Sequence, residues 1–354
     1  MKQRLVHIDV LRGICIFVVV YCHQTGFCMN DMPRTGIIHF LTLLFVPMFF
    51  FISGFVGYKD TAGWTLGETK AFLLKKVNTL LIPTVCAMSL CLVVCQGGWT
   101  GLWDGISGGV MFLNPSKGGY WFTVALFVME LVYCAIMVGI SRFKKRAGNV
   151  VLAVGMLAAY VLKKTSIAEE GTVADLFCLG NVLWFLPFFL LGVLCKREQD
   201  VFHKLMANRW VQLALLAVLV MALTTSFVPL IVQIVTICLV AYYVVKGFCE
   251  HLGDCQEAII GGMSKKFVAL FSVIGQYTLQ IYFLHYILLF RLPDSVCAYL
   301  LQSHVATCYG HTFSSVVELM VVGSSSLLIC FLCICLSLVI KQLPFAHKLL
   351  FGKP

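Results

Sequence analysis

The sequence predicts an all-α integral membrane protein with about ten transmembrane helices and both termini in the cytoplasm. Of its 354 residues, 60% are hydrophobic and only 12% are charged, whereas soluble domains carry about 25% charged residues. The apolar residues gather in runs long enough to cross a bilayer, which takes about 20 residues. No segment is polar enough and long enough to form a soluble domain, so we expect one membrane domain over residues 1–354.

Ten apolar runs are candidate membrane spans. The fifth is short, and the seventh and eighth are separated only by the turn around Pro229, so these two could also form one broken segment. In chain order the runs cover residues 8–28, 36–58, 78–96, 120–141, 148–163, 176–195, 210–228, 230–247, 268–290 and 316–340.

The distribution of Lys and Arg predicts the orientation of these spans. With a cytoplasmic N-terminus, 21 of the 26 Lys and Arg residues fall on the inside and the other 5 on the outside. Cytoplasmic loops of membrane proteins carry this excess, so the ten spans place both termini inside. The same clustering accounts for the net charge of +10. Because no basic stripe is interleaved with aromatic residues, we expect no nucleic-acid partner.

The 17 cysteines do not indicate a metal site. Most lie inside apolar runs, where cysteine packs as a small hydrophobic residue. No Cys pair is combined with a second Cys pair or a His pair at the spacing of a zinc site, so we expect no metal. Cys297 and Cys308 share one loop and could pair if that loop faces an oxidising compartment.

The first span carries three polar groups that a membrane disfavours. Asp9, Arg12 and His23 lie in or beside it, and a charged group near a helix centre costs about 2.5–3.5 kcal/mol on insertion scales. Arg12 and His23 are eleven residues apart, so they project from one face about 16 Å apart along the axis. Asp9 can pair with Arg12. The alternatives are an interfacial anchor for Asp9 and Arg12, and a bond to a neighbouring helix for His23.

The ninth span carries a second histidine. Thr278, Tyr282 and His285 fall at positions i, i+4 and i+7 and share one helix face. His285 lies in the outer half of its span, near the depth of His23, so we expect the two imidazoles to share a polar pocket. The alternative is a stripe of hydrogen bonds between helices.

Three further spans carry candidate site residues. Ser53, after Pro47 in the second span, could donate to a ligand or bond back to its own helix. Tyr120 and Trp121 begin the fourth span, where aromatic residues are typical of a membrane interface. Glu130 lies in the middle of that span and needs a partner or a proton, and an intramembrane carboxylate is a functional candidate.

Six short motifs in order resemble the signature series of the membrane acyltransferase-3 family, over residues 8 to about 285. The family consists of polytopic bacterial enzymes that O-acylate cell-envelope glycans. The motifs are Asp9-Val10-Leu11-Arg12-Gly13 with His23, Phe50-Phe51-Ile52-Ser53-Gly54-Phe55, Leu81-Ile82-Pro83, Tyr120-Trp121-Phe122, Leu186-Pro187-Phe188-Phe189-Leu190-Leu191-Gly192, and Gly275 with Tyr282-Phe283-Leu284-His285.

The resemblance implies transfer of an acyl group, acetyl above all, from cytoplasmic acyl-CoA to a hydroxyl of an envelope carbohydrate or lipid-linked glycan. The compartment implied is the bacterial inner membrane. The family usually has a basic pair three residues apart beside the third span. Here those positions hold Lys76 and Thr79, with Lys75 adjacent and able to substitute.

The resemblance also implies roles for individual residues. Lys75, Lys76 and Arg12 would hold the phosphates of the donor, and His23 would act as the general base on the acceptor hydroxyl. Ser53 would serve as an oxyanion donor or as structure. No Ser, His and Asp order for an acyl-enzyme is visible, so we expect direct transfer. The residues expected to line the acceptor site are Tyr120, Trp121, Glu130, Tyr282 and His285.

Two other functions are consistent with the same residues. A proton-coupled secondary transporter would use His23, Glu130 and His285 as proton-relay groups. A membrane-embedded sensor or channel-like protein would carry out no catalysis. Acyl-CoA turnover that depends on His23 favours the enzyme, and uptake that depends on Glu130 favours the transporter.

Overall fold

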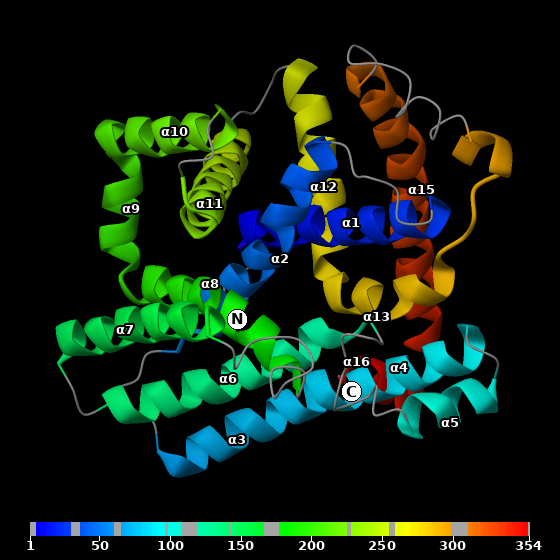
Figure 1. Cartoon of the computed structure of the whole chain (residues 1–354), viewed down its shortest axis with the longest axis horizontal. Helices are drawn as coiled ribbons and strands as arrows, with labels where there is room; N and C mark the ends of the chain where they lie inside the picture. Colours follow the sequence, from blue (N-terminus) through cyan, green and yellow to red (C-terminus); the bar gives the residue numbers. More distant parts are fainter. Residues whose placement is uncertain are drawn as a thin grey trace. The chain divides into compact units, whose positions relative to one another are not determined.

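The structure is a computed structural model that describes residues 5–29, 36–59, 65–95, 98–107, 119–141, 144–165, 177–224, 228–254, 259–298 and 311–352. Over these residues the chain is helical, without a strand, as the sequence predicts (Figure 1). The helices are α1 (Val6–Met29), α2 (Gly36–Gly57), α3 (Leu66–Lys76), the π-helix η1 (Val77–Leu81), α4 (Ile82–Cys95), α5 (Trp99–Ser107), α6 (Trp121–Ile140), α7 (Lys145–Lys163), α8 (Leu179–Arg197), α9 (Gln199–Ala207), α10 (Arg209–Thr224), α11 (Leu230–Asp254), α12 (Ile259–Gln276), α13 (Thr278–Leu288), α15 (His311–Ile340) and α16 (Pro344–Phe351).

Seven helices of the described chain are long and apolar enough to cross a membrane, and two bent helix pairs raise the number to nine. The sequence predicts about ten spans. The predicted span 268–290 is not one straight helix, because α12 and α13 meet at an angle of 81°. Tyr277 is the N-cap residue of α13, and the hydroxyl of Thr278 donates to the carbonyl of Gly275 at 2.6 Å.

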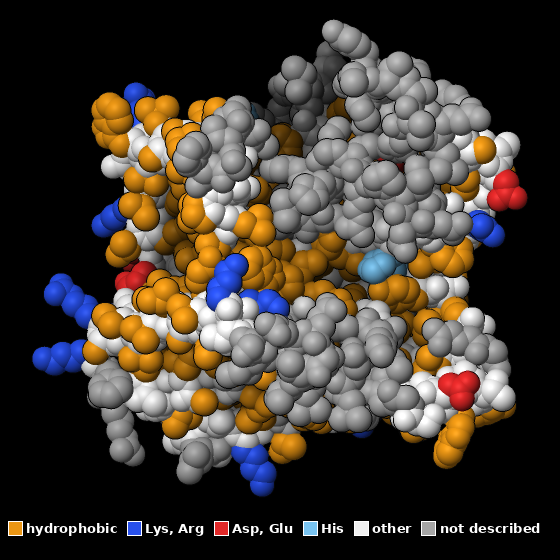
Figure 2. Space-filling view, viewed as in Figure 1, with side chains coloured by type: hydrophobic (Ala, Val, Ile, Leu, Met, Phe, Trp, Pro, Cys, Tyr) orange, Lys and Arg blue, Asp and Glu red, His pale blue; other side chains and the backbone are white. Residues whose placement is uncertain are grey.

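The exposed surface agrees with a lipid environment. On α7, Val150, Val154, Leu157 and Val161 are all more than half exposed, and their spacing places them on one helical stripe. Figure 2 shows hydrophobic side chains over most of the described surface on the face drawn, with few charged ones. A soluble protein rarely exposes so large an apolar area. The chain is therefore a multi-pass membrane protein.

The chain folds into two compact units, each built from two separate stretches. Unit 1 contains Met1–Val46 and Val218–Val339, and unit 2 contains Pro47–Ala217 and Ile340–Pro354. One boundary falls inside α2, between Val46 and Pro47. The single domain predicted over residues 1–354 stays a prediction.

Unit 1 is organised around the crossing of α1 and α12 (Figure 1). A Cβ atom at Gly13 would overlap the backbone carbonyl of Phe271, and one at Gly275 would overlap the carbonyl of Asp9. Each helix therefore uses a glycine to let the other backbone approach directly, as small residues do between membrane helices. α11 and α13 also pack against α1.

Unit 2 contains a second glycine crossing, between α2 and α8. A Cβ atom at Gly54 would overlap the carbonyl of Phe189, and one at Gly192 would overlap the carbonyl of Phe51. Each of these two helices also uses a glycine to let the other backbone approach directly. Both phenylalanine side chains are fully buried, so the crossing sits in the core of the unit.

The π-helix η1 ends at Leu81, two residues before Pro83. Proline has no backbone N–H, so the carbonyl of Thr79 lacks its usual helical donor. The backbone widens here, and the N–H of Ile82 bonds to the carbonyl of Val77 five residues earlier. The hydroxyl of Thr84 donates to the carbonyl of Leu80 at 2.6 Å. Such π-turns frequently mark functional sites.

Candidate functional site

Two histidines from distant helices meet inside unit 1. His23 comes from α1 and His285 from α13, and their ring centroids lie 5.2 Å apart. His285 is fully buried, whereas His23 is half-buried. The structure therefore brings together the two imidazoles that the sequence predicts to share a pocket.

Backbone hydrogen bonds determine which ring nitrogen of His285 carries the proton. Its Nδ1 lies 2.8 Å from the carbonyl of Tyr282 and 3.1 Å from the carbonyl of Ile281. Carbonyl oxygens only accept, so Nδ1 must be the donor and Nε2 keeps its lone pair. Within the described part of the chain, that buried Nε2 has no hydrogen-bond partner. An unsatisfied buried acceptor costs about 1–3 kcal/mol, which a ligand hydroxyl would recover.

Tyr286 is a site residue that the sequence reasoning missed. Its hydroxyl lies 3.1 Å from Nε2 of His23. Its ring centroid lies 4.8 Å from that of His23 and 4.2 Å from that of His285. Tyr286 follows Tyr282 by four residues, so the helical pattern contained a signal for it. Tyr282 itself is buried, with its ring centroid 6.2 Å from that of His285.

Polar contacts on α1 hold His23 opposite α13. The amide of the next residue, Gln24, is fully buried and donates to the carbonyl of Phe290 at 2.8 Å. Two residues before His23, the hydroxyl of Tyr21 donates to Glu318 of α15 at 3.2 Å. Glu318 is 1% exposed. The sequence reasoning missed this carboxylate, although a lone Glu in an apolar run was the signal.

Asp9 and Arg12 lie near the start of α1. Asp9 is buried and Arg12 is half-buried. Arg12 and His23 belong to one continuous helix, so the separation of about 16 Å expected from their spacing holds. The pairing of Asp9 with Arg12 stays a prediction.

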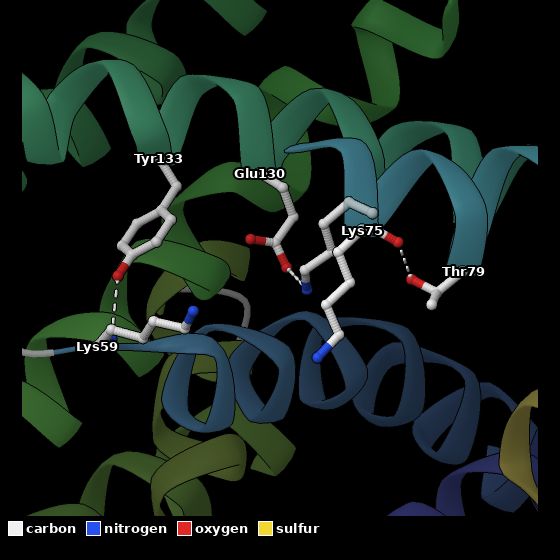
Figure 3. A network of polar contacts seen from close by, with 6 residues as sticks. Lys59, Lys75, Thr79, Glu130 and Tyr133 are labelled. Atoms are coloured by element: carbon white, nitrogen blue, oxygen red, sulfur yellow. Dashed lines mark hydrogen bonds and ion pairs between the residues drawn. The ribbon is translucent and has the colours of Figure 1, made fainter. Parts of the chain in front are cut away.

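Glu130, in unit 2, forms an ion pair with Lys76. This pair supplies the partner that an intramembrane carboxylate needs. The Oε1 atom of Glu130 lies 2.5 Å from Nζ of Lys76, and the glutamate side chain is only 1% exposed. Figure 3 shows Glu130 and Tyr133 projecting from the same side of α6. The hydroxyl of Tyr133 accepts the backbone N–H of Lys59 at 3.2 Å. Lys76 is therefore engaged in a buried ion pair rather than presented to a ligand.

An aromatic ring, that of Phe72, lies next to this ion pair and contacts two lysine side chains. The ammonium groups of Lys59 and Lys76 lie 4.9 Å and 5.1 Å from the ring centroid of Phe72. Such cation–π contacts stabilise a charge that is partly withdrawn from water. Lys75, by contrast, is exposed, and its backbone carbonyl accepts the hydroxyl of Thr79 at 2.9 Å (Figure 3).

The remaining predicted residues lie in the aromatic core of unit 2. Tyr120 is fully buried, which does not fit a membrane-interface belt at that position. Trp121 is half-buried and stacks on Phe185 with centroids 5.7 Å apart. Ser53 is half-buried on α2. The structure thus places these residues in unit 2 and the histidines in unit 1.

The described residues contain no group of three His, Cys, Asp or Glu side chains that could hold a metal ion. Cys308 lies outside the residues that the structure describes, so its pairing with Cys297 stays a prediction. The chemistry available in unit 1 is that of two adjacent imidazoles, of which His285 has a buried Nε2 without a hydrogen-bond partner in the described chain. This arrangement can bind a hydroxyl and accept its proton.

Comparison with known proteins identifies the family of the chain. The model of the acyltransferase-3 family, described as an acyltransferase domain, matches residues 5–335, nearly the whole chain. No curated protein and no solved structure matches. The match favours an enzyme over the transporter and the sensor that the residues alone left open.

Proposed function

Because the chain belongs to the acyltransferase-3 family of membrane O-acyltransferases, we propose that it acylates a cell-envelope carbohydrate. The donor is acyl-CoA, acetyl-CoA in the first instance, from the cytoplasm. The acceptor is a hydroxyl of an envelope carbohydrate or lipid-linked glycan on the other side. The protein then resides in a bacterial inner membrane, with both termini cytoplasmic, as the excess of Lys and Arg in the inside loops favours.

The observation that carries the proposal is the open lone pair of His285 beside the ring of His23. A sugar hydroxyl that donates to Nε2 of His285 satisfies a buried acceptor that lacks a donor in the described chain. The hydroxyl next to it on the sugar then lies near His23. In this assignment His285 binds and orients the acceptor.

His23 is the better candidate for the general base. An imidazolium at fully buried His285 would lose all its hydration, whereas half-buried His23 keeps part of it. The Tyr286 hydroxyl at 3.1 Å also holds the His23 ring in a fixed orientation. Together these features support a base at His23 and a binding contact at His285.

The reaction balances without any further reagent. The acceptor oxygen attacks the thioester carbon while His23 takes the hydroxyl proton, so a C–O bond forms. The C–S bond then breaks, and the leaving thiolate takes the proton from His23 to give free CoA. Neither an oxidant nor a metal takes part in this sequence.

Measurement of CoA release tests this proposal. The purified chain in detergent is given acetyl-CoA with and without an acceptor glycan, and free thiol is followed over time. We expect turnover in the wild type, a loss of about 10²–10⁴-fold in His23→Ala, and wild-type rates in the control His251→Ala on α11. Mass spectrometry of envelope glycans with and without the protein identifies the acyl group and the acceptor. The proposal fails if acetyl-CoA is not consumed and no acyl mass disappears.

A further inference from the structure

Unit 2 contains a cavity of about 650 Å³ between the α3–η1–α4 segment and the C-terminal helix α16. Lys75, Asn78 and Thr79 line it from one side. Lys348 and Phe345 line it from α16. The cavity thus combines two ammonium groups, an amide and a hydroxyl with apolar walls.

Helix α16 packs against α4 and touches the π-helix at its C-terminal end, so its contribution to the cavity is part of the fold. Phe351 is fully buried. Gly352 caps the helix with φ +64°, a conformation that favours glycine. A Cβ atom at Gly352 would overlap the backbone carbonyl of Asn78. The helix therefore ends in direct contact with η1, and Lys348 lies one turn before that contact.

The two lysines of the cavity differ from their neighbour Lys76. Lys76 is neutralised by Glu130. Neither Lys75 nor Lys348 has a carboxylate within 4 Å in the part of the chain that the structure describes. Both side chains are exposed. Two uncompensated ammonium groups that line one cavity attract an anion.

The apolar side chains that line the cavity indicate which kind of anion it can bind. Leu74, Ile82 and Leu349 line the cavity with apolar groups, so a ligand with an apolar part gains contacts that a bare ion does not. Phosphate oxygens accept from Lys and amide groups in short charge-assisted bonds. A phosphate group attached to a larger, partly apolar molecule satisfies both requirements.

We propose that this cavity is a phosphate site in which Lys348 of α16 supplies the second cation beside Lys75. The phosphate belongs either to the nucleotide end of acyl-CoA, which rests on the proposed function, or to the headgroup of an anionic phospholipid. In both cases the C-terminal helix is a ligand-binding element.

Binding measurements on the full-length protein test the site without relying on turnover. Free CoA is titrated into the protein in neutral detergent by calorimetry, and the variants Lys75→Gln, Lys348→Gln and Lys341→Gln are compared. Lys341 lies in the turn between α15 and α16 and does not line the cavity. If CoA is the ligand, we expect at least a fivefold loss of affinity in the first two variants and none in the control.

A second experiment tests whether the headgroup of an anionic phospholipid binds at this site. The same variants are placed in nanodiscs of phosphatidylcholine with and without phosphatidylglycerol, and their melting temperatures are recorded. If the headgroup is the ligand, the stabilisation by phosphatidylglycerol falls in Lys75→Gln and Lys348→Gln but not in Lys341→Gln. The proposal is overturned if both variants match the wild type in both experiments. These experiments measure binding and not turnover. If the wild type binds CoA through Lys348 but transfers no acyl group, the proposed function is contradicted and the phosphate site is not.

Discussion

The ring centroids of His23 and His285 lie 5.2 Å apart, although the two residues come from α1 and α13. The carbonyls of Ile281 and Tyr282 fix the proton of His285 on Nδ1. The lone pair on Nε2 is thereby left without a donor in the described chain. This unsatisfied acceptor supports the proposal that His285 binds the acceptor hydroxyl.

His285→Leu tests the acceptor contact. Leucine has no hydrogen-bond acceptor at the position of Nε2, so we expect the KM for the acceptor to rise about tenfold or more, as loss of a buried hydrogen bond of 1–3 kcal/mol implies. The KM for acetyl-CoA should stay near the wild-type value. Steady-state kinetics with each substrate varied in turn makes the measurement. An equal rise in both KM values would argue for a general structural defect.

Gly13→Ala tests the crossing of α1 and α12. The added methyl group would overlap the backbone carbonyl of Phe271, and overpacking of this kind typically costs 1–3 kcal/mol or more. We expect a lower melting temperature in detergent and loss of activity, since α1 carries His23. Gly247→Ala on α11 is the control, because its new methyl group meets no atom within 4 Å. Equal melting temperatures for the two variants would contradict the backbone contact.

Removal of one member of the Lys76–Glu130 pair tests its structural role. Lys76→Met leaves a buried carboxylate without its cation, and breaking a buried ion pair typically costs 3–5 kcal/mol. We expect a large fall in melting temperature, and a partial recovery in the double variant Lys76→Met with Glu130→Leu. A proton-relay role for Glu130 instead predicts a stable Glu130→Gln that has lost function.

The stability of the α7–α8 connection should depend on pH through Glu198. The Asn149 amide at 2.8 Å, followed by the Lys145 ammonium at 3.1 Å, holds the pKa of Glu198 below its ordinary value. A carboxylate with a lowered folded pKa stabilises the protein above its unfolded pKa of about 4.3, and this contribution disappears as pH falls through the folded value.

Glu198→Gln measures this contribution. At neutral pH we expect the variant to be less stable by no more than about 1 kcal/mol, since partly exposed ion pairs contribute little. The difference in melting temperature between wild type and variant should shrink towards zero as pH falls below 4.3. A difference that stays constant over this range would rule out the carboxylate as its source.

The helices and the main polar groups could be predicted from the sequence because both depend on local pattern. Apolar runs indicated most of the helices, and the cost of an intramembrane charge indicated that Glu130 needs a partner. The similar depth of His23 and His285 in their spans predicted that they share a pocket. The structure brings their rings together, and the pocket itself stays a prediction.

The partners of these groups could not be predicted in the same way. Lys76 meets Glu130, Glu318 meets Tyr21, and Gly275 meets Gly13 only through helix packing between distant segments. The bend at Tyr277 was also missed, because the apolar run continues through it. Periodicity describes one helix at a time and carries no information on which helix lies opposite.

The most direct test of the central claim is CoA release by His23→Gln with Arg12 and His285 intact, measured against the wild type and His251→Gln. If His23 is the general base, the rate of acyl transfer falls about 10²–10⁴-fold, while acetyl-CoA binding and melting temperature stay unchanged. Wild-type transfer rates in His23→Gln would contradict the claim.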